Sequence, residues 1–151
     1  MKIAIGSDHA GFPLKASVAE WLAGQGHDIL DLGTKGTDSV DYPDFAKSVC
    51  HAVLSGKADR GILVCNSGIG MSISANRNRG IRAALCLFPT MAHFARRHND
   101  ANVLVLAGGL TACFLAIETV KVFLAEPFDG GRHERRIRLM DEGGDGGQAG
   151  G

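Results

Sequence analysis

The fold of this chain is decided by GILVCNSGIGMS, the stretch from Gly61 to Ser72. Apolar residues that lead into small ones predict a buried parallel strand, and the glycine-rich turn after them predicts a helix start. The backbone amides of such a turn favour an oxyanion or a phosphate above it. Since ligands of open α/β sheets bind outside the carboxyl ends of the strands, we expect Cys65 and Ser67 to face a substrate. The alternative is that Cys65 is a buried core cysteine that ends a strand.

Apolar runs and helix-period segments alternate on both sides of this stretch. Strands are predicted at Lys2 to Gly6, Asp28 to Leu32, Gly61 to Cys65, Ile81 to Cys86 and Val103 to Leu106. Helices are predicted between and after them, near Pro13 to Ala23, Pro43 to Leu54, Gly70 to Arg77, Pro89 to Arg97 and Thr111 to Ala125. This order predicts the α/β class, a three-layer α/β/α sandwich around a five-stranded parallel sheet.

The alternation of strands and helices ends near the C-terminus. Gly130-Gly131 breaks the pattern, and Arg132 to Met140 predicts a short, charged C-terminal helix. A length of 151 residues favours a single domain. We expect that domain to span 1–141 and a disordered, glycine-rich tail to follow over 142–151, because the tail has too few apolar residues to offset the entropy of ordering.

The charge balance and the cysteines narrow the class of function. Lys plus Arg and Asp plus Glu number 16 each, so we expect neither a nucleic-acid partner nor a membrane surface. The stretch before Asp8 is too short for a signal peptide, and no apolar run is long enough to span a bilayer, so we expect a cytoplasmic protein. The cysteines show neither a CxxC pair nor metal-ligand spacing, which predicts free thiols and no metal or cofactor.

Polar residues also follow the first predicted strand. GSDHAG runs from Gly6 to Gly11, so Asp8 and His9 are expected at the same edge of the sheet as Cys65 and Ser67. Asp8 alternatively only caps the next helix. An imidazole in a polar turn is suited to donate a hydrogen bond to a phosphate or a hydroxyl near neutral pH.

Further candidates lie in the second half of the chain and in one loop. His98-Asn99 closes a predicted helix, where a histidine alternatively serves only the helix dipole. Arg132 and Arg136 are four residues apart on one helix face, which suits either bidentate phosphate binding or a solvated basic surface. Tyr42 follows a polar loop, where its ring is suited to wall a pocket or to pack at an oligomer interface.

Five motifs occur in order: GSDHAG at Gly6 to Gly11, DYPDFA at Asp41 to Ala46, CNSGIGMSI at Cys65 to Ile73, RHND at Arg97 to Asp100 and GGRHERR at Gly130 to Arg136. Together they resemble ribose-5-phosphate isomerase of the B type, a family that also includes the galactose-6-phosphate isomerase subunits. The resemblance runs from Lys2 to about Met140. It implies a Rossmann-like fold, a homodimer or a dimer of dimers, and a metal-free aldose–ketose isomerisation of a phosphorylated sugar.

The resemblance also implies roles for the motif residues. Cys65 matches the catalytic base, His98 the residue that opens the furanose ring, and Ser67 a group that moves protons between two substrate oxygens. The implied substrate contacts are Asp8 and Asn99 to sugar hydroxyls, His9 near the phosphate, and Arg132 and Arg136 to the phosphate of the neighbouring subunit's site. Gly68, Ile69, Gly70 and Ser72 match the anion hole, and Tyr42 and Asn66 complete the expected substrate-binding set. Elementary chemistry agrees, because forming an enediolate needs one base and fixed donors for the developing oxygen charge.

Two residues depart from the family pattern. Asn66 replaces the usual glycine after the cysteine, which is tolerable if this position has a left-handed backbone. Leu110 stands in a motif where the family generally has a phosphate-binding arginine. Either Arg132 and Arg136 suffice, or the substrate is another four- to six-carbon sugar phosphate, of the tetrose, allose or galactose type. A further alternative is a non-catalytic sugar-phosphate binding protein on the same fold.

Overall fold

Five strands pair into one parallel sheet in the computed structural model, which describes residues 1–142. They are β1 (Lys2–Ser7), β2 (Asp28–Asp31), β3 (Arg60–Cys65), β4 (Ala83–Leu85) and β5 (Val103–Ala107). The order across the sheet is β2-β1-β3-β5-β4, and every neighbouring pair is parallel. β3 is therefore central, which explains why its residues after Arg60 form an uninterrupted buried run.

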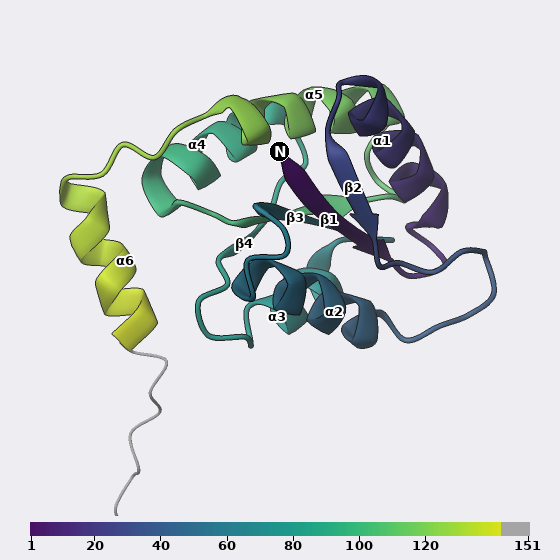
Figure 1. The fold of residues 1–151 in the computed structure, drawn as a ribbon, viewed down its shortest axis with the longest axis horizontal. Helices are drawn as coiled ribbons and strands as arrows, with labels where there is room; N and C mark the ends of the chain where they lie inside the picture. Colours follow the sequence, from purple (N-terminus) through teal and green to yellow (C-terminus); the bar gives the residue numbers. More distant parts are fainter. Residues whose placement is uncertain (143–151) are drawn as a thin grey trace, which may run out of the picture.

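Helices cover both faces of the sheet (Figure 1). One layer contains α1 (Phe12–Gly24), α4 (Pro89–Asn99) and α5 (Cys113–Ala125), and the other contains α2 (Tyr42–Leu54) and α3 (Ile69–Ala75). A sixth helix, α6 (Arg132–Glu142), lies beyond α4 at the margin of the molecule. Pro13, Pro43 and Pro89 each occupy a first helical turn, where the missing amide donor costs nothing. The predicted three-layer α/β/α fold is confirmed.

The two faces of β3 face different halves of the core. Ile62 and Val64 pack with the layer of α1, α4 and α5, whereas Leu63 and Cys65 pack with α2 and α3. This alternation is the period-two pattern of a strand. It sets the side chain of Cys65 on the side of α3, the helix that begins a few residues later.

Several predicted boundaries shift, and those of β4, α5 and α6 differ most clearly. β4 is shorter than expected, because the backbone N–H of Arg82 donates to the side chain of Asn102 before the ladder begins. α5 begins at Cys113, because the N–H groups of Leu110 and Thr111 both donate to the carbonyl of Ala107 in a turn. α6 includes Glu142, and the rest of the predicted tail, 143–151, lies outside the described residues.

Within residues 1–142, none of the helices has the length and apolar character needed to cross a bilayer.

Candidate active site

The loops after three neighbouring strands approach each other at backbone distance, at the carboxyl edge of the sheet. A Cβ atom added at Gly11 would lie only 2.6 Å from the carbonyl carbon of Val64. Gly108 N–H donates to the carbonyl oxygen of Cys65 over 2.7 Å. Glycine at both positions therefore lets the loops after β1 and β5 close against the end of β3.

Cys65 and Ser67 lie in the turn between β3 and α3. The thiol residue is 5% exposed, within the cluster between the sheet and α2 and α3. The hydroxyl of Ser67 accepts a hydrogen bond from Ile69 N–H over 3.3 Å. Gly68 caps α3 with a left-handed backbone, φ 75°. The N–H groups of Gly70 and Met71 precede the first intrahelical bond, from Ser72 N–H to the Gly68 carbonyl, and so remain available to an anion.

The left-handed backbone that would make Asn66 tolerable in place of glycine is not present at this position. Asp100 is the one non-glycine residue with a positive φ among those described. The left-handed residue of the turn is Gly68, two positions later. Asn66 therefore does not substitute for the conformational freedom of glycine.

Asp8 and His9 lie at the same edge, after β1. Asp8 Oδ1 accepts from Gly11 N–H over 2.9 Å, so one carboxylate oxygen stabilises the turn and the other is left for a ligand. His9 Nδ1 accepts from Val40 N–H over 3.2 Å. A neutral histidine that accepts at Nδ1 carries its proton on Nε2, so His9 presents a donor on its other side.

Tyr42 covers the start of α3. A Cβ atom at Gly70 would meet the Tyr42 ring at 2.7 Å, so ring and helix start are in direct contact. Lys15, which the sequence analysis missed, anchors the loop that leads to Tyr42. Its buried ammonium donates to both carboxylate oxygens of Asp31, at 2.8 and 2.6 Å, and to the carbonyl of Thr34. A lysine within an apolar helix face gives no sequence signal for this role.

His98 and Asn99 lie at the opposite edge of the sheet. α4 begins after the carboxyl end of β4 and ends before the amino end of β5, so its last residues lie at the amino edge. Arg82, just before β4, confirms this position by donating from Nε to the carbonyl of Asn99 over 3.0 Å. β5 alone, from Val103 to Ala107, spans roughly 13 Å at about 3.3 Å per residue. Within one chain, His98 and Cys65 therefore do not meet.

The arginines of α6 belong to the same amino-edge group. His133 and Ile137 form the buried face of α6, while Arg132 and Arg136 are exposed. The His133 ring stacks on His98 with centroids 4.3 Å apart and planes 9° apart, which docks α6 on the end of α4. Neither Arg132 nor Arg136 forms a salt bridge within the described part of the chain, so both guanidinium groups are available to an anion.

The residues around His98 and His133 also shift the pKa values of their neighbours at the amino edge. Burial, followed by the charges of His98, Arg132 and Arg136, lowers the pKa of His133 below its usual value. Arg97 donates to Asp129 over 2.8 Å, and this hydrogen bond holds the pKa of that carboxyl below its usual range. The lowered pKa therefore favours a neutral His133 beside Arg132 and Arg136, neither of which forms a salt bridge within residues 1–142.

One set of side chains resembles a metal-binding group. Donor atoms of His98, Asp129 and His133 lie within 4.8 Å of one another. The two imidazole planes are only 9° apart, and Arg97 already binds Asp129 Oδ1, at 2.8 Å from Nε and 2.7 Å from Nη2. These side chains therefore fit a role in orienting the imidazole rings better than they fit a zinc site, whose ligands converge tetrahedrally on the metal.

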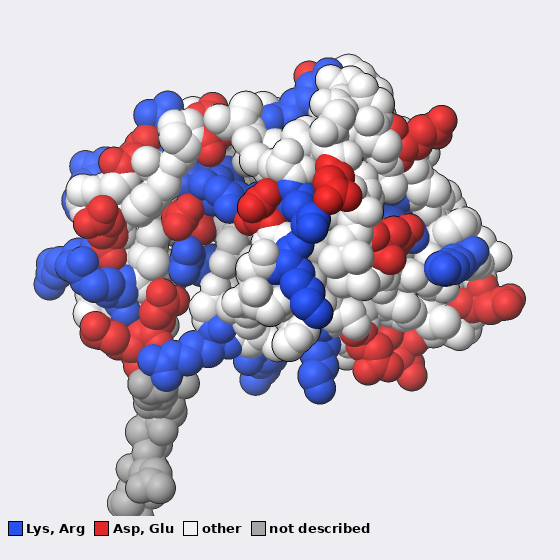
Figure 2. Space-filling view, in the orientation of Figure 1, with Lys and Arg blue, Asp and Glu red and all other residues white. Residues whose placement is uncertain are grey.

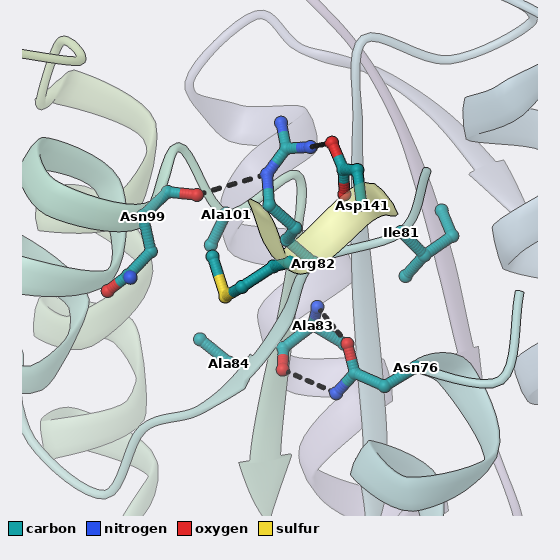
Figure 3. Close-up of a pocket in the computed structure, with 9 residues that line it drawn as sticks. Asn76, Ile81, Arg82, Ala83, Ala84, Asn99, Ala101 and Asp141 are labelled. Carbon is teal, nitrogen blue, oxygen red and sulfur yellow. Dashed lines mark hydrogen bonds and ion pairs between the residues drawn. The ribbon is translucent and has the colours of Figure 1, made fainter. Parts of the chain in front are cut away.

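A cavity of about 390 Å³ opens beside this cluster (Figure 3). Asn99, Arg82 and Asp141 contribute to its wall, and Cys65 does not line it. Its polar groups already pair with each other: Asn76 bonds the N–H and the carbonyl of Ala83, and Arg82 Nη1 lies 3.6 Å from Asp141. These groups are therefore engaged with one another, and the thiol of Cys65 lies outside this cavity.

Charge is not concentrated on the face that Figure 2 displays, where basic and acidic groups alternate. This pattern agrees with the balanced composition. Specific anion recognition then depends on single groups such as Arg132 and Arg136, rather than on a general field.

The cysteines differ in their surroundings. Burial raises the pKa of Cys50 to about 11 and that of Cys86 to about 12. Cys113 is exposed at the start of α5. Only Cys65 combines a strand end with a glycine-rich turn.

Leu110, at the position where the family generally has an arginine, is 68% exposed in the turn after β5. The preceding residue, Gly109, is the one that touches the Cys65 loop, since a Cβ atom there would overlap the side chain of Asn66.

Comparison with known proteins decides the family. The model of the ribose/galactose isomerase family matches residues 3–140. The chain belongs to this family. Ribose-5-phosphate isomerase B of Escherichia coli strain K12 is 42% identical over 139 residues, which cover 92% of this chain and 93% of that protein.

Solved structures of the family share the fold. The ribose 5-phosphate isomerase of Thermotoga maritima is 61% identical, with a TM-score of 0.93 over 93% of this chain and 97% of the other. Ribose-5-phosphate isomerase B of Clostridium thermocellum is 48% identical, with a TM-score of 0.93 over 94% of this chain and 96% of the other.

Proposed function

We propose that this chain interconverts an aldose phosphate and a ketose phosphate through an enediolate, with ribose 5-phosphate and ribulose 5-phosphate as the pair. Membership of the isomerase family and the names of the relatives support the reaction class and the sugar. The observation that carries the mechanism is the thiol of Cys65, beside a glycine-rich turn with free backbone N–H groups.

The chemistry needs a base and a set of donors. Cys65 removes the proton from the carbon next to the carbonyl and returns it to the neighbouring carbon. The thiolate is the form of a cysteine that acts as a base. The available backbone N–H groups of Gly70 and Met71 stabilise the oxygen charge of the enediolate, and Gly68, Ile69 and Ser72 complete the turn that forms the anion hole. Ser67 transfers the proton between the two substrate oxygens.

The remaining contacts divide between two subunits. Asp8 binds a sugar hydroxyl, His9 donates toward the phosphate, and Tyr42 walls the pocket. Because His98, Asn99, Arg132 and Arg136 lie at the opposite edge of the sheet, we assign them to the site of a second copy. In a homodimer or a dimer of dimers, the partner's His98 opens the furanose ring, and the partner's Arg132 and Arg136 hold the phosphate.

This mechanism uses no metal or cofactor and depends on a reduced thiol. A cytoplasmic location, where thiols stay reduced, suits it.

Isomerase assays on purified protein test the proposal. Four- to six-carbon aldose phosphates are supplied, and ketose formation is measured for the native chain, for Cys65→Ala and for Cys113→Ala as the matched control. We expect turnover of ribose 5-phosphate, a loss of roughly 10²–10⁴-fold for Cys65→Ala, and near-native activity for Cys113→Ala. Binding without turnover by the native chain would indicate a sugar-phosphate binding protein instead. A Cys65→Ala variant with more than about a tenth of native activity would reject the base.

A further inference from the structure

Asp129 is tied to the residue before His98 through both its backbone and its side chain. It lies in the segment between α5 and α6 (Figure 1), and its backbone N–H donates to the carbonyl oxygen of Arg97 over 3.0 Å. The Arg97 side chain returns two contacts, from Nε at 2.8 Å and from Nη2 at 2.7 Å, and both reach the same oxygen, Oδ1. This reciprocal contact fixes the carboxylate beside the end of α4.

The second carboxylate oxygen of Asp129, Oδ2, accepts no hydrogen bond from any of residues 1–142. Ring nitrogens of His98 and His133 and a carboxylate oxygen of Asp129 all lie within 4.8 Å of one another. Hydrogen bonds between functional groups are often long in a free enzyme and tighten when the substrate binds. The carboxylate is therefore placed to accept from an imidazole N–H.

Two ring contacts hold the plane of the His98 imidazole. Its centroid lies 5.0 Å from that of Phe94 and 4.3 Å from that of His133, and the two imidazole planes are 9° apart. Turning the imidazole over by 180° keeps this plane but moves both ring nitrogens, so stacking alone does not select between the two orientations. A carboxylate at the ring edge does select, because it favours the orientation that points an N–H toward it.

We propose that Asp129 is a positioning residue for His98, whose carboxylate accepts from one imidazole nitrogen and holds the other toward the sugar. This inference rests on the proposed function, in which His98 opens the furanose ring in the site of a second copy. It adds the residue that orients the imidazole, as a third group orients the base in other enzymes. Arg97 keeps the carboxylate ionised, because its hydrogen bond holds the pKa of Asp129 below the usual range.

Neutralising the carboxylate tests this role. Asp129→Asn keeps the size of the side chain and removes its charge, and Glu126→Gln is the matched control. Glu126 lies 3.7 Å from the same Arg97 but contacts His93, at 2.8 Å, instead of His98. We expect Asp129→Asn to lower kcat for ribose 5-phosphate roughly 10–100-fold and Glu126→Gln to leave it near native. Equal losses in both variants would mean a general effect of charge around Arg97 and would overturn the positioning role.

The division of the effect between kcat and KM separates orientation from docking. If Asp129 only held α6 in place, its loss would also displace Arg132 and Arg136 and would raise KM. Orientation of His98 instead predicts a fall in kcat with KM nearly unchanged. A raised KM with native kcat would therefore assign Asp129 to the docking of α6 and contradict the proposal.

A double-mutant cycle shows whether Asp129 acts through His98. The His98→Ala chain is assayed at high protein concentration, with and without Asp129→Asn. Because the imidazole that Asp129 orients is already absent, we expect no further loss of kcat/KM from the second substitution. A second loss as large as that in the native background would mean that Asp129 acts independently of His98.

The NMR signals of the imidazole rings give a readout that needs no turnover. Asp129→Asn should move the ring signals of His98, while those of His9, at the opposite edge of the sheet, should stay in place. Signals that move only at His133, or at neither ring of the stack, would overturn the orientation of His98. Failure of the native chain on every sugar phosphate would instead reject the isomerase and leave the NMR result to decide the contact.

Discussion

The two edges of the sheet carry different functional groups of the proposed active site. The carboxyl edge holds the thiol of Cys65, the hydroxyl of Ser67 and free backbone donors, but no arginine or lysine of the proposed site. The amino edge holds His98 together with Arg132 and Arg136, which form no salt bridge with residues 1–142. The carboxyl edge offers the thiol without an arginine of the proposed site, and the amino edge offers His98 and the arginines without the thiol.

The difference follows from the topology. In a parallel sheet, the residue after a strand lies at the carboxyl edge and the residue before the next strand lies at the amino edge. Motifs that are proposed to act on the same substrate are therefore separated by the length of a strand within one chain. Two copies related by a twofold axis bring opposite edges together twice, which completes two equal sites.

The largest expected effect comes from mixing inactive chains. Cys65→Ala and His98→Ala proteins should each be nearly inactive, and subunit exchange between them should restore about a quarter of native activity. Half of the dimers are hybrids, and each hybrid has one intact site. Activity is measured after exchange has been verified with differently tagged chains.

The control pair joins two lesions from the same edge. Cys65→Ala mixed with Ser67→Ala should recover nothing, because each site then carries one of the two lesions. Recovery in this pair, or none in the first, would show that the two edges do not complement each other between subunits.

A smaller effect is expected at the amino edge alone. Arg132→Ala and Arg136→Ala each remove a charged contact to phosphate, worth about 1.5–3 kcal/mol, so the KM for ribose 5-phosphate should rise roughly 10–150-fold. Arg138→Ala, on an exposed part of the same helix, is the control and should leave KM unchanged. Steady-state kinetics on the three variants decide. An equal rise in KM for all three variants would mean that the total positive charge of α6, and not a specific contact of Arg132 or Arg136, affects substrate binding.

Alkylation of the thiols tests whether Cys65, at the carboxyl edge, is the reactive cysteine. At pH 8, Cys50 and Cys86 remain protonated, because burial raises their pKa values to about 11 and about 12, and thiols react as thiolates. Iodoacetamide should inactivate the protein through Cys65, and substrate at ten times its Kd should slow this about tenfold. Cys113→Ser should inactivate at the native rate. Peptide mapping that finds label only at Cys113 in inactive protein contradicts the assignment.

The smallest effect is expected at Leu110. Its exposed side chain lies beyond the residue that touches Asn66, so Leu110→Arg should change the KM for ribose 5-phosphate by less than about twofold. A marked fall in KM would show that an arginine at this position reaches the phosphate, as the sequence comparison alone suggested.

Local patterns in the sequence were sufficient for the fold. The apolar run from Gly61 to Cys65 predicts a buried strand because a central parallel strand has no solvent face, and the three helix-starting prolines mark helix starts because φ is fixed there. The ends of β4 and α5 were less predictable, because hydrogen bonds to Asn102 and Ala107 set them.

The candidate residues were named by the sequence, and their grouping was decided by the tertiary structure. Residue type and motif identify Cys65, His98 and Arg136 as chemically competent, since a thiol, an imidazole and a guanidinium carry their properties with them. Which of them share an edge depends on strand order and helix direction, which no local pattern contains. The contact between Asn66 and Gly109 joins residues 43 positions apart, from 66 to 109, through loops that meet only in the folded sheet. The sequence determined the groups that react, and the packing of the chain determined which of them meet.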